Sequence, residues 1–352
     1  MSAGPATPYP ATPTGSRRTS LPRARGPVTA ILLEVLRGPL GMPVELPAVE
    51  PAPELLADDD AQLALYLCYE LHYGELEGVN DGWEWDPGLL AFRAVLERAF
   101  EAALREVVPA PPAVPPSEVG DALQRLVAED DGASLSRYVE TRATAEQLRE
   151  LFVHRSGYQL KEADPHSWAI PRLSGAPKAA LVEVQADEYG GGRAERVHAT
   201  LFANAMAALG LDPTYGAYLE RLPGTTLATV NLMSLCGLHR RLRGAIVGHL
   251  AAFEMTSSLP NRRYGNGLRR LGFGIDATDF FDEHVEADAV HEQIAAWDLA
   301  GGLARAEPAL ADDVLWGAAA LLEVEGRCGR RILGAWQRGE SSLRADLTRF
   351  AG

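Results

Sequence analysis

The sequence predicts an all-α protein, a bundle of long helices with an additional helical region at its N-terminal end. Two observations lead to this prediction. β-Branched residues are sparse, and nowhere do apolar and polar residues alternate over the length of a strand. Long segments instead have a helical pattern and are joined by loops of modest length. With 352 residues, of which 47% are hydrophobic, the chain can build one large core.

The N-terminal helical region is expected at residues 27–140, after a disordered tail over residues 1–26 that is rich in Pro, Ser, Thr and Ala. Two helices are predicted between Ala61 and Val107, separated by a turn at Gly78–Pro87. The proline-rich segment Pro109–Pro116 then forms a linker or rigid turn, because a helix cannot continue through it.

Aromatic residues suggest what this N-terminal region does. Its amphipathic pattern places five of them at the surface: Tyr66, Tyr69, Tyr73, Trp83 and Trp85. Surface aromatics on short helices are more typical of a dimerisation or lid region than of a catalytic one. We therefore expect a homodimer.

The second region, residues 141–352, is predicted to hold the larger bundle. After Asp121–Ala128, the segment Leu135–Arg155 continues the helical pattern, with Thr144 as an N-cap and Gln147 completing a capping box. Gly157–Pro177, with its three prolines, is expected to be irregular. Four long helices follow at about 179–209, 226–257, 279–300 and 307–338, and Asn261–Gly274 is predicted to be a loop because it contains four glycines and four arginines.

Composition excludes several classes of function. The net charge of −15 argues against a nucleic-acid-binding protein and disfavours anionic membranes. The sequence contains no stretch that is long and apolar enough to span a membrane, and Ser16-Arg17-Arg18 is not followed by the apolar segment of an export signal. Cys68, Cys236 and Cys328 are scattered, which is typical of small buried side chains in a reducing cytoplasm. We expect a cytoplasmic protein.

A metal site is the most specific prediction. His284, Asp288 and His291 lie at positions i, i+4 and i+7 of a predicted helix, so their side chains leave one face. Two imidazoles and a carboxylate on one face form half of a transition-metal site. Glu254 lies in the apolar run AIVGHLAAFEM, where a lone carboxylate is costly unless a positive charge meets it.

The segment Glu183–His198 supplies further ligands from another helix. Glu188 is one candidate, and either Glu195 or His198 is its partner. On a straight helix Glu195 lies above Glu188, whereas His198 is turned away by about 80°. The glycines at 190–192 would each cost a helix interior about 1 kcal/mol, so they indicate a packing or functional role.

Ordinary structural roles compete with this prediction. The triad on residues 284–291 could be a solvated helix face, and Glu254 could pair with Arg243 or Arg262. A metal with ligands from three separated helices explains these placements together. Carboxylates bridge two irons through their two oxygens, imidazoles act as terminal ligands, and helical bundles present both inward.

Together these residues resemble the heme-oxygenase-like diiron oxidases and oxygenases, over roughly residues 150–340. The resemblance implies a heme-oxygenase-like helical bundle that binds two irons, with O₂ as cosubstrate. The ligands that it implies are Glu162, Glu188, His198, Glu254, His284, Asp288 and His291. Glu254 would bridge or chelate, Asp288 and Glu188 would complete the carboxylate set, and the histidines would be terminal ligands.

The spacing of these ligands is similar to that of the N-oxygenating members, in which Glu162 would be an extra carboxylate ligand. The resemblance therefore implies an oxygenase that oxidises a small amine or amino acid at nitrogen in specialised metabolism, with electrons from an external donor. It assigns the reaction itself to Glu188, Glu254 and Asp288. A cupin domain that one such member carries at its C-terminal end is not part of this sequence, so N–N bond formation through such a domain is not expected.

Two alternatives stay open. The same iron site could perform oxidative C–C cleavage or desaturation of an amino or fatty acid, or the chain could be a metal-free helical binding protein. For a substrate carboxylate, arginine offers bidentate binding, and the candidates are Arg172, Arg193, Arg262, Arg263 and Tyr264.

Overall fold

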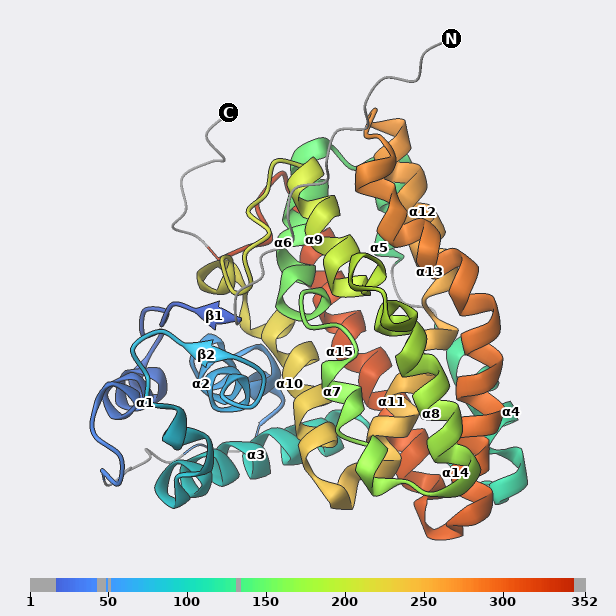
Figure 1. Ribbon diagram of the computed structural model, residues 1–352, viewed down its shortest axis with the longest axis horizontal. Helices are drawn as coiled ribbons and strands as arrows, with labels where there is room; N and C mark the ends of the chain where they lie inside the picture. The colour runs from blue at the N-terminus through green and yellow to red at the C-terminus, as the bar shows by residue number, and fades with distance from the viewer. Residues whose placement is uncertain (1–16, 43–48, 50–51, 131–133, 345–352) are drawn as a thin grey trace.

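The computed structural model describes residues 17–42, 49, 52–130 and 134–344, without the side chains of residues 286–290. Figure 1 shows a bundle of long helices with a smaller group of helices, α1 to α3, against one side. The fold is all-α, as predicted, and the strands in the described part are two segments of two residues each.

The N-terminal elements are β1 (Arg18–Thr19), α1 (Pro27–Arg37), α2 (Asp59–Glu70), β2 (Glu75–Leu76), α3 (Pro87–Val107), α4 (Val119–Ala128) and α5 (Leu135–Thr141). The main bundle contains α6 (Ala145–Gln159), α7 (Asp164–Ser167), α8 (Gly175–Glu188), α9 (His198–Ala208), α10 (Gly224–Leu238), α11 (Arg243–Met255), α12 (Ser258–Arg270), α13 (Ile275–Gln293), a π-helical segment (Ile294–Ala300), α14 (Gly301–Ala306) and α15 (Ala311–Gln337).

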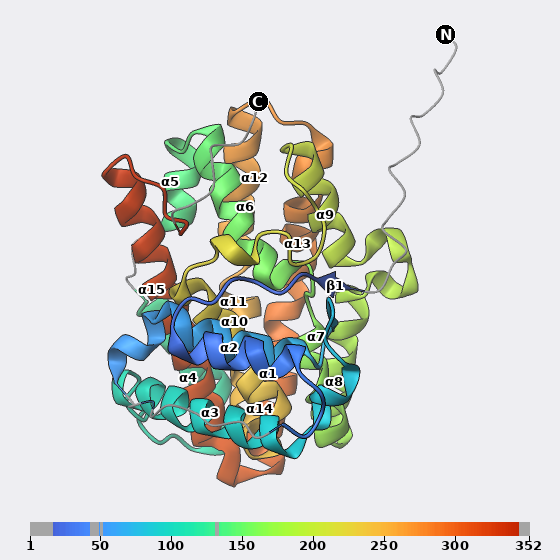
Figure 2. The ribbon, with the colours of Figure 1, turned by 90° about the vertical axis from the view of Figure 1, so that its left-hand side faces the viewer.

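Helices α1, α2 and α3 run across the bundle rather than along it (Figure 2). Asp58 caps α2 by accepting hydrogen bonds from the amides of Asp60 and Ala61, and Asp86 caps α3 in the same way. The predicted pair of helices with a turn between them is therefore confirmed. Helix α2 packs against α10, so this region shares its core with the main bundle.

The N-terminal aromatics are mostly core residues. Tyr66, Tyr69 and Trp83 have exposed fractions of 3%, 1% and 0%, whereas Trp85 is 63% exposed. The predicted surface position is therefore wrong for these three residues, and the role of residues 27–140 as a dimerisation or lid region stays a prediction. The homodimer itself stays a prediction.

The predicted disordered tail extends too far. β1 pairs in parallel with β2, and Arg17 forms an ion pair with Asp164 of the main bundle. Residues 17–26 are thus held against the folded protein, while residues 1–16 lie outside the described part.

A buried ion pair joins the N-terminal region to the bundle. Lys161 Nζ donates to Glu70 Oε2 at 2.7 Å, and the side chains are 1% and 0% exposed. The ammonium also lies 4.4 Å and 4.7 Å from the ring centroids of Tyr73 and Tyr66. Because a buried charge without a partner is strongly destabilising, this pair fixes the turn after α6 to α2.

The predicted start of α6 is confirmed. Thr144 Oγ1 accepts from the amide of Gln147 at 3.2 Å, and the Gln147 side chain accepts from the amide of Thr144 at 3.0 Å. The irregular segment predicted at Gly157–Pro177 is confirmed for residues 160–174, where a four-residue helix, α7, and a 3₁₀ turn lie, whereas its first three residues belong to α6 and its last three to α8.

Two of the four predicted long helices are interrupted. The helix expected at 179–209 breaks at residues 190–192, where all three glycines have positive φ (69°, 59° and 81°). The helix expected at 226–257 breaks at His239, whose backbone is extended. The other two are confirmed with shifted ends, as α13 with its π-helical continuation and as α15.

The loop predicted at Asn261–Gly274 is wrong, because its first ten residues belong to α12. A Cβ on Gly267 would lie 2.8 Å from the carbonyl oxygen of Val139, so this glycine allows α12 to approach α5 closely. Arg270 donates to the carbonyl oxygens of Val139 and Ala143. The glycines and arginines that resembled a loop thus serve the packing of a helix.

Glycines also bring α11 and α15 into backbone contact. A Cβ on Gly248 would lie 1.7 Å from the carbonyl oxygen of Val314, and one on Gly317 would lie 2.0 Å from that of Ala245. The three cysteines are buried and unpaired with one another, as expected. None of the helices in the described ranges combines the length and the apolar character needed to cross a bilayer.

Candidate metal centre

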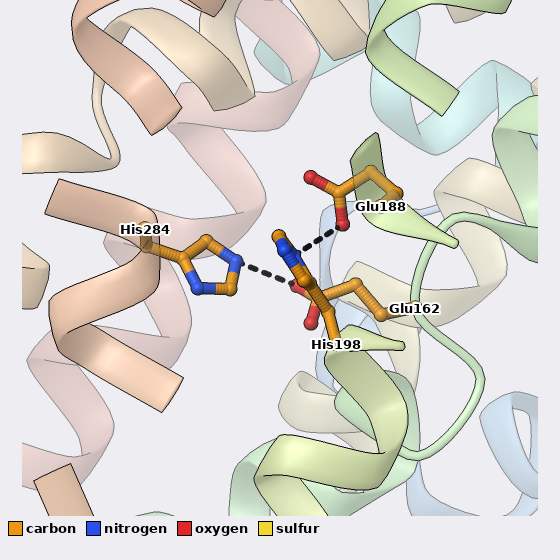
Figure 3. A group of neighbouring side chains, drawn as sticks. All are labelled: Glu162, Glu188, His198 and His284. Atoms are coloured by element: carbon orange, nitrogen blue, oxygen red, sulfur yellow. Dashed lines mark ion pairs between the residues drawn. The ribbon is translucent and has the colours of Figure 1, made fainter. Parts of the chain in front are cut away.

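Four buried side chains from four parts of the chain meet inside the bundle (Figure 3). Glu162 lies in the turn after α6, Glu188 ends α8, His198 begins α9 and His284 lies on α13. Each offers one ligand atom, and these atoms all lie within 4.8 Å of one another. Ligand atoms about 2.1 Å from one ion lie at most about 4.2 Å apart, so small side-chain movements would let the four hold a metal ion.

The break after α8 explains how Glu188 and His198 come together. A Cβ on Gly190 would lie 2.6 Å from the carbonyl carbon of Arg196, so the glycine lets the chain fold back on itself. His198 Nδ1 then lies 2.8 Å from Glu188 Oε2. Glu195 lies in the connecting turn and is exposed. The partner of Glu188 is therefore His198, and the straight-helix argument for Glu195 fails because the helix is not continuous.

A second group lies beside the first and shares Glu188 with it. Its other members are Glu254 of α11 and His291 of α13, and all three side chains are buried. His291 Nδ1 lies 3.6 Å from Glu254 Oε2, and His284 Nε2 lies 3.7 Å from Glu162 Oε1. The carboxylate common to both groups is Glu188, and the bridging or chelating role that the resemblance implies for Glu254 stays a prediction.

The donor atoms are those of a metal site. Glu162 Oε2 is buried and has no hydrogen-bond partner within the described residues, and the buried atoms Glu188 Oε2, His198 Nδ1 and His291 Nδ1 face only other members of the two groups there. Such atoms are rare in folded proteins unless something else binds them. Carboxylate oxygens and imidazole nitrogens suit iron, so the residues present fit the metal that the sequence predicts.

Outer contacts orient two of the histidines. His284 Nδ1 lies 2.7 Å from the carbonyl oxygen of Phe280, which leaves Nε2 facing Glu162. His291 Nε2 lies 2.9 Å from Asp187 Oδ2, which leaves Nδ1 facing Glu254. Metal-binding histidines commonly make such a bond with the second ring nitrogen. Asp187 was not predicted, although its position directly before Glu188 could have suggested it.

Electrostatics favours charged side chains at both groups. Burial acts to raise the pKa of Glu188, but the imidazoles of His198, His284 and His291 lower it to about 2. Burial acts to lower the pKa of His291, but Glu254, Asp187 and Glu188 raise it to about 9. In the metal-free protein the cluster therefore holds the ionised carboxylate of Glu188 beside the protonated imidazole of His291, and a metal cation would replace that proton.

A cavity of about 500 Å³ adjoins the first group, and Glu162 and His284 line it. Arg263 and Tyr264 also line it, as expected for substrate-binding residues. Arg155, Tyr158 and Glu325 line it as well and were not predicted. Arg155 and Tyr158, on α6, precede Glu162 in the following turn by seven and four residues, and this helical spacing is the signal that could have identified them.

The other predicted substrate residues lie elsewhere. Arg172 donates to the carbonyl oxygens of Gly237 and Leu238 at the end of α10. Arg193 and Arg262 are exposed, and neither is among the residues that line the cavity. Asp288 lies on α13, but its side chain is outside the described part, so its role as a ligand stays a prediction.

Comparison with known proteins agrees with this geometry. Residues 149–326, half of the chain, match the family described as iron-containing redox enzyme. The chain is also similar to nitrosourea synthase of Streptomyces achromogenes subsp. streptozoticus, with 30% identity over 139 residues. The aligned part is 39% of this chain and 29% of that protein, so less than a third of the relative's length is covered.

Proposed function

Since this chain belongs to the iron-containing redox enzyme family, we propose that it is an O₂-dependent nonheme diiron oxygenase that oxidises a small amine or amino acid at nitrogen. The observation that carries the proposal is the position of Glu188, which belongs to both metal-binding groups. A carboxylate has two oxygens and can serve two ions at once. The similarity to nitrosourea synthase supports a reaction at nitrogen.

The residues divide between the two ions. Glu162, Glu188, His198 and His284 would hold one, while Glu188, Glu254 and His291 would hold the other. Bound iron supplies the activation of O₂. Asp288 would join this set, as the sequence predicts. Asp187 and the carbonyl oxygen of Phe280 keep His291 and His284 oriented in the absence of metal.

The overall reaction needs an external reductant. Oxidation of an amine to a hydroxylamine places one oxygen atom of O₂ between nitrogen and hydrogen. The other oxygen atom leaves as water with two protons and two electrons. The chain's own cysteines are buried, and burial raises the pKa of Cys68 and of Cys328 to about 12, so their thiols stay protonated. We therefore assign these electrons to a separate donor.

The proposal is tested by loading the full-length protein with Fe(II) without oxygen and counting bound iron. The wild-type chain should bind two ions. Glu188→Gln should lose both, whereas Glu254→Gln should keep one. Glu183→Gln is the matched control, because Glu183 lies on the same helix and is exposed. A wild-type chain that binds no iron, or one tightly held zinc, would contradict the proposal.

Product mass then separates this reaction from its alternatives. Oxygenation at nitrogen adds one oxygen atom, whereas desaturation removes two hydrogens and C–C cleavage yields two smaller products. A chain that binds iron but forms only a desaturated or cleaved product would retain the diiron part of the proposal and overturn the N-oxygenase part.

A further inference from the structure

Two opposite charges face the cavity beside the metal centre. Arg155 comes from α6 and Glu325 from α15, and both line the cavity. Glu325 is exposed and lies in the wall of the cavity, so its carboxylate is open to whatever the cavity holds. Within the described residues no ion pair joins the two side chains, although each feels the charge of the other.

The guanidinium of Arg155 is held in a fixed orientation. It lies over the ring of Tyr264, with its central carbon 4.8 Å from the ring centroid, and Nη2 donates to the Tyr264 hydroxyl at 3.2 Å. Arginine has five N–H donors, so this arrangement leaves donors for a ligand. A planar guanidinium with a fixed orientation is suited to bind a carboxylate through two parallel hydrogen bonds.

Glu325 is in the complementary situation. It lies within hydrogen-bonding reach of Thr229, and burial raises the pKa of its carboxyl, which Arg155 and Thr229 counteract in part. Its carboxylate lies in the cavity wall, where a cationic group that enters the cavity can pair with it. Arg155 is too far away to close an ion pair with it, so a positively charged group of a ligand would complete the site.

We infer that Arg155 and Glu325 bind a zwitterionic amino acid, with its carboxylate on Arg155 and its cationic amino group on Glu325. This inference rests on the proposed function, because Glu162 and His284 of the metal centre line the same cavity. It narrows the substrate to molecules that carry both charges. Fatty acids and simple amines, which carry one charge each, are poor substrates on this account.

The test measures binding to the full-length, metal-free protein by calorimetry, with the proteinogenic L-amino acids as probes. At least one should bind to the wild-type chain. Two analogues of the best binder are then compared, the amine that lacks its carboxylate and the acid that lacks its amino group. Each analogue should bind about tenfold or more weakly, because each leaves one of the two cavity charges without its ligand partner.

The variants assign each charge to its residue. Arg155→Gln should weaken binding of the amino acid about tenfold or more but leave binding of the decarboxylated analogue unchanged. Glu325→Gln should also weaken binding of the amino acid about tenfold or more, but leave binding of the deaminated analogue unchanged. Glu323→Gln is the control, because Glu323 lies on the same helix and pairs with Arg327 instead. If Arg155→Gln does not fold, Glu325→Gln alone decides the outcome.

The inference is overturned if none of the amino acids binds, or if the analogues bind as well as the parent compound. It is also overturned if both variants bind the amino acid like the wild-type chain. Iron counting is done separately on the same variants, which should still bind two ions. A wild-type chain that binds an amino acid but no iron would overturn the proposed function and leave the zwitterion site intact.

Discussion

Replacing Gly317 with alanine tests the contact between α11 and α15 on which the position of Glu254 depends. A Cβ at this position would lie 2.0 Å from the carbonyl oxygen of Ala245, whereas ordinary contact begins at 3.4 Å. The obstacle is backbone, which cannot rotate away as a side chain can. The two helices would therefore have to separate by roughly 1.4 Å at this point.

The expected cost follows from this distance. Overpacking of a core costs about 1–3 kcal/mol, and a clash with backbone belongs at the upper end of that range. Alanine offsets this by about 1 kcal/mol, because it favours the helix over glycine. The free energy of unfolding of Gly317→Ala should therefore fall by about 2 kcal/mol. Since α11 also carries Glu254, retention of iron at the second group should fall too.

Gly334→Ala provides the matched control on the same helix. A Cβ there would lie 3.5 Å from the tip of Arg338, which is ordinary contact with a flexible side chain. This variant should gain up to about 1 kcal/mol in helix propensity, so the two variants should differ by about 3 kcal/mol. Urea unfolding measures both free energies. Equal stability of the two variants would refute the close approach of α11 and α15.

Three further predictions concern charges in and around the centre. Asp187→Asn removes the exposed carboxylate that orients His291 through Nε2, so iron affinity should fall roughly 10–100-fold while the free energy of unfolding in urea is unchanged. Iron affinity equal to that of the wild-type chain, measured in competition with a chelator, would contradict this role. Lys161→Met leaves Glu70 buried and uncompensated and should cost about 3–5 kcal/mol in urea unfolding, most of which the double variant with Glu70→Gln should recover. Because the pKa of His291 is raised from 6.5 to about 9, its stabilising interactions in the metal-free protein are complete below pH 6.5 and are lost as the pH rises through 9. Fe(II) affinity should change in the opposite direction over that range, since the metal displaces the proton, and a titration without that slope would exclude His291 as a ligand.

The sequence was most informative where one residue pattern has one physical meaning. Helical spacing alone was enough to place His284 and His291 on one face of α13, and the capping box at Thr144 gave the start of α6. Helical periodicity and the scarcity of strand signals gave the all-α fold. Such patterns are local, so a single sequence contains them in full.

Predictions failed where the same residues serve two purposes. Gly267 and Arg270 are typical of a loop, yet in α12 the first permits close packing on α5 and the second binds backbone carbonyl oxygens. Conversely, the glycines at 190–192 do break a helix, and that break decides that His198 rather than Glu195 faces Glu188. Which role a glycine takes depends on the neighbouring helix, and the local sequence does not contain that information.

The charged residues of the cavity could not be found from the sequence for a related reason. Arg155 and Glu325 are 170 positions apart, and each is ordinary within its own helix. Their role in ligand binding becomes visible only in the folded protein, where α6 and α15 line the same cavity. Arg172, by contrast, looked like a substrate clamp but binds the end of α10.

The ion pair between Glu70 and Lys161 has a consequence for how the chain matures during synthesis. Glu70 leaves the ribosome 91 residues before Lys161. In the folded protein Glu70 is fully buried, and Tyr66 and Tyr73 pack against the ammonium of Lys161 that it binds. Until Lys161 emerges, burial of Glu70 would leave a carboxylate without a partner in the core. We therefore expect the N-terminal helices to complete their packing only after the later half of the chain is available. The segment that matches the family begins at residue 149 and includes only one partner of this pair. The segment that matches the family therefore ends inside a packed core, because it leaves out Glu70, the partner of the buried Lys161.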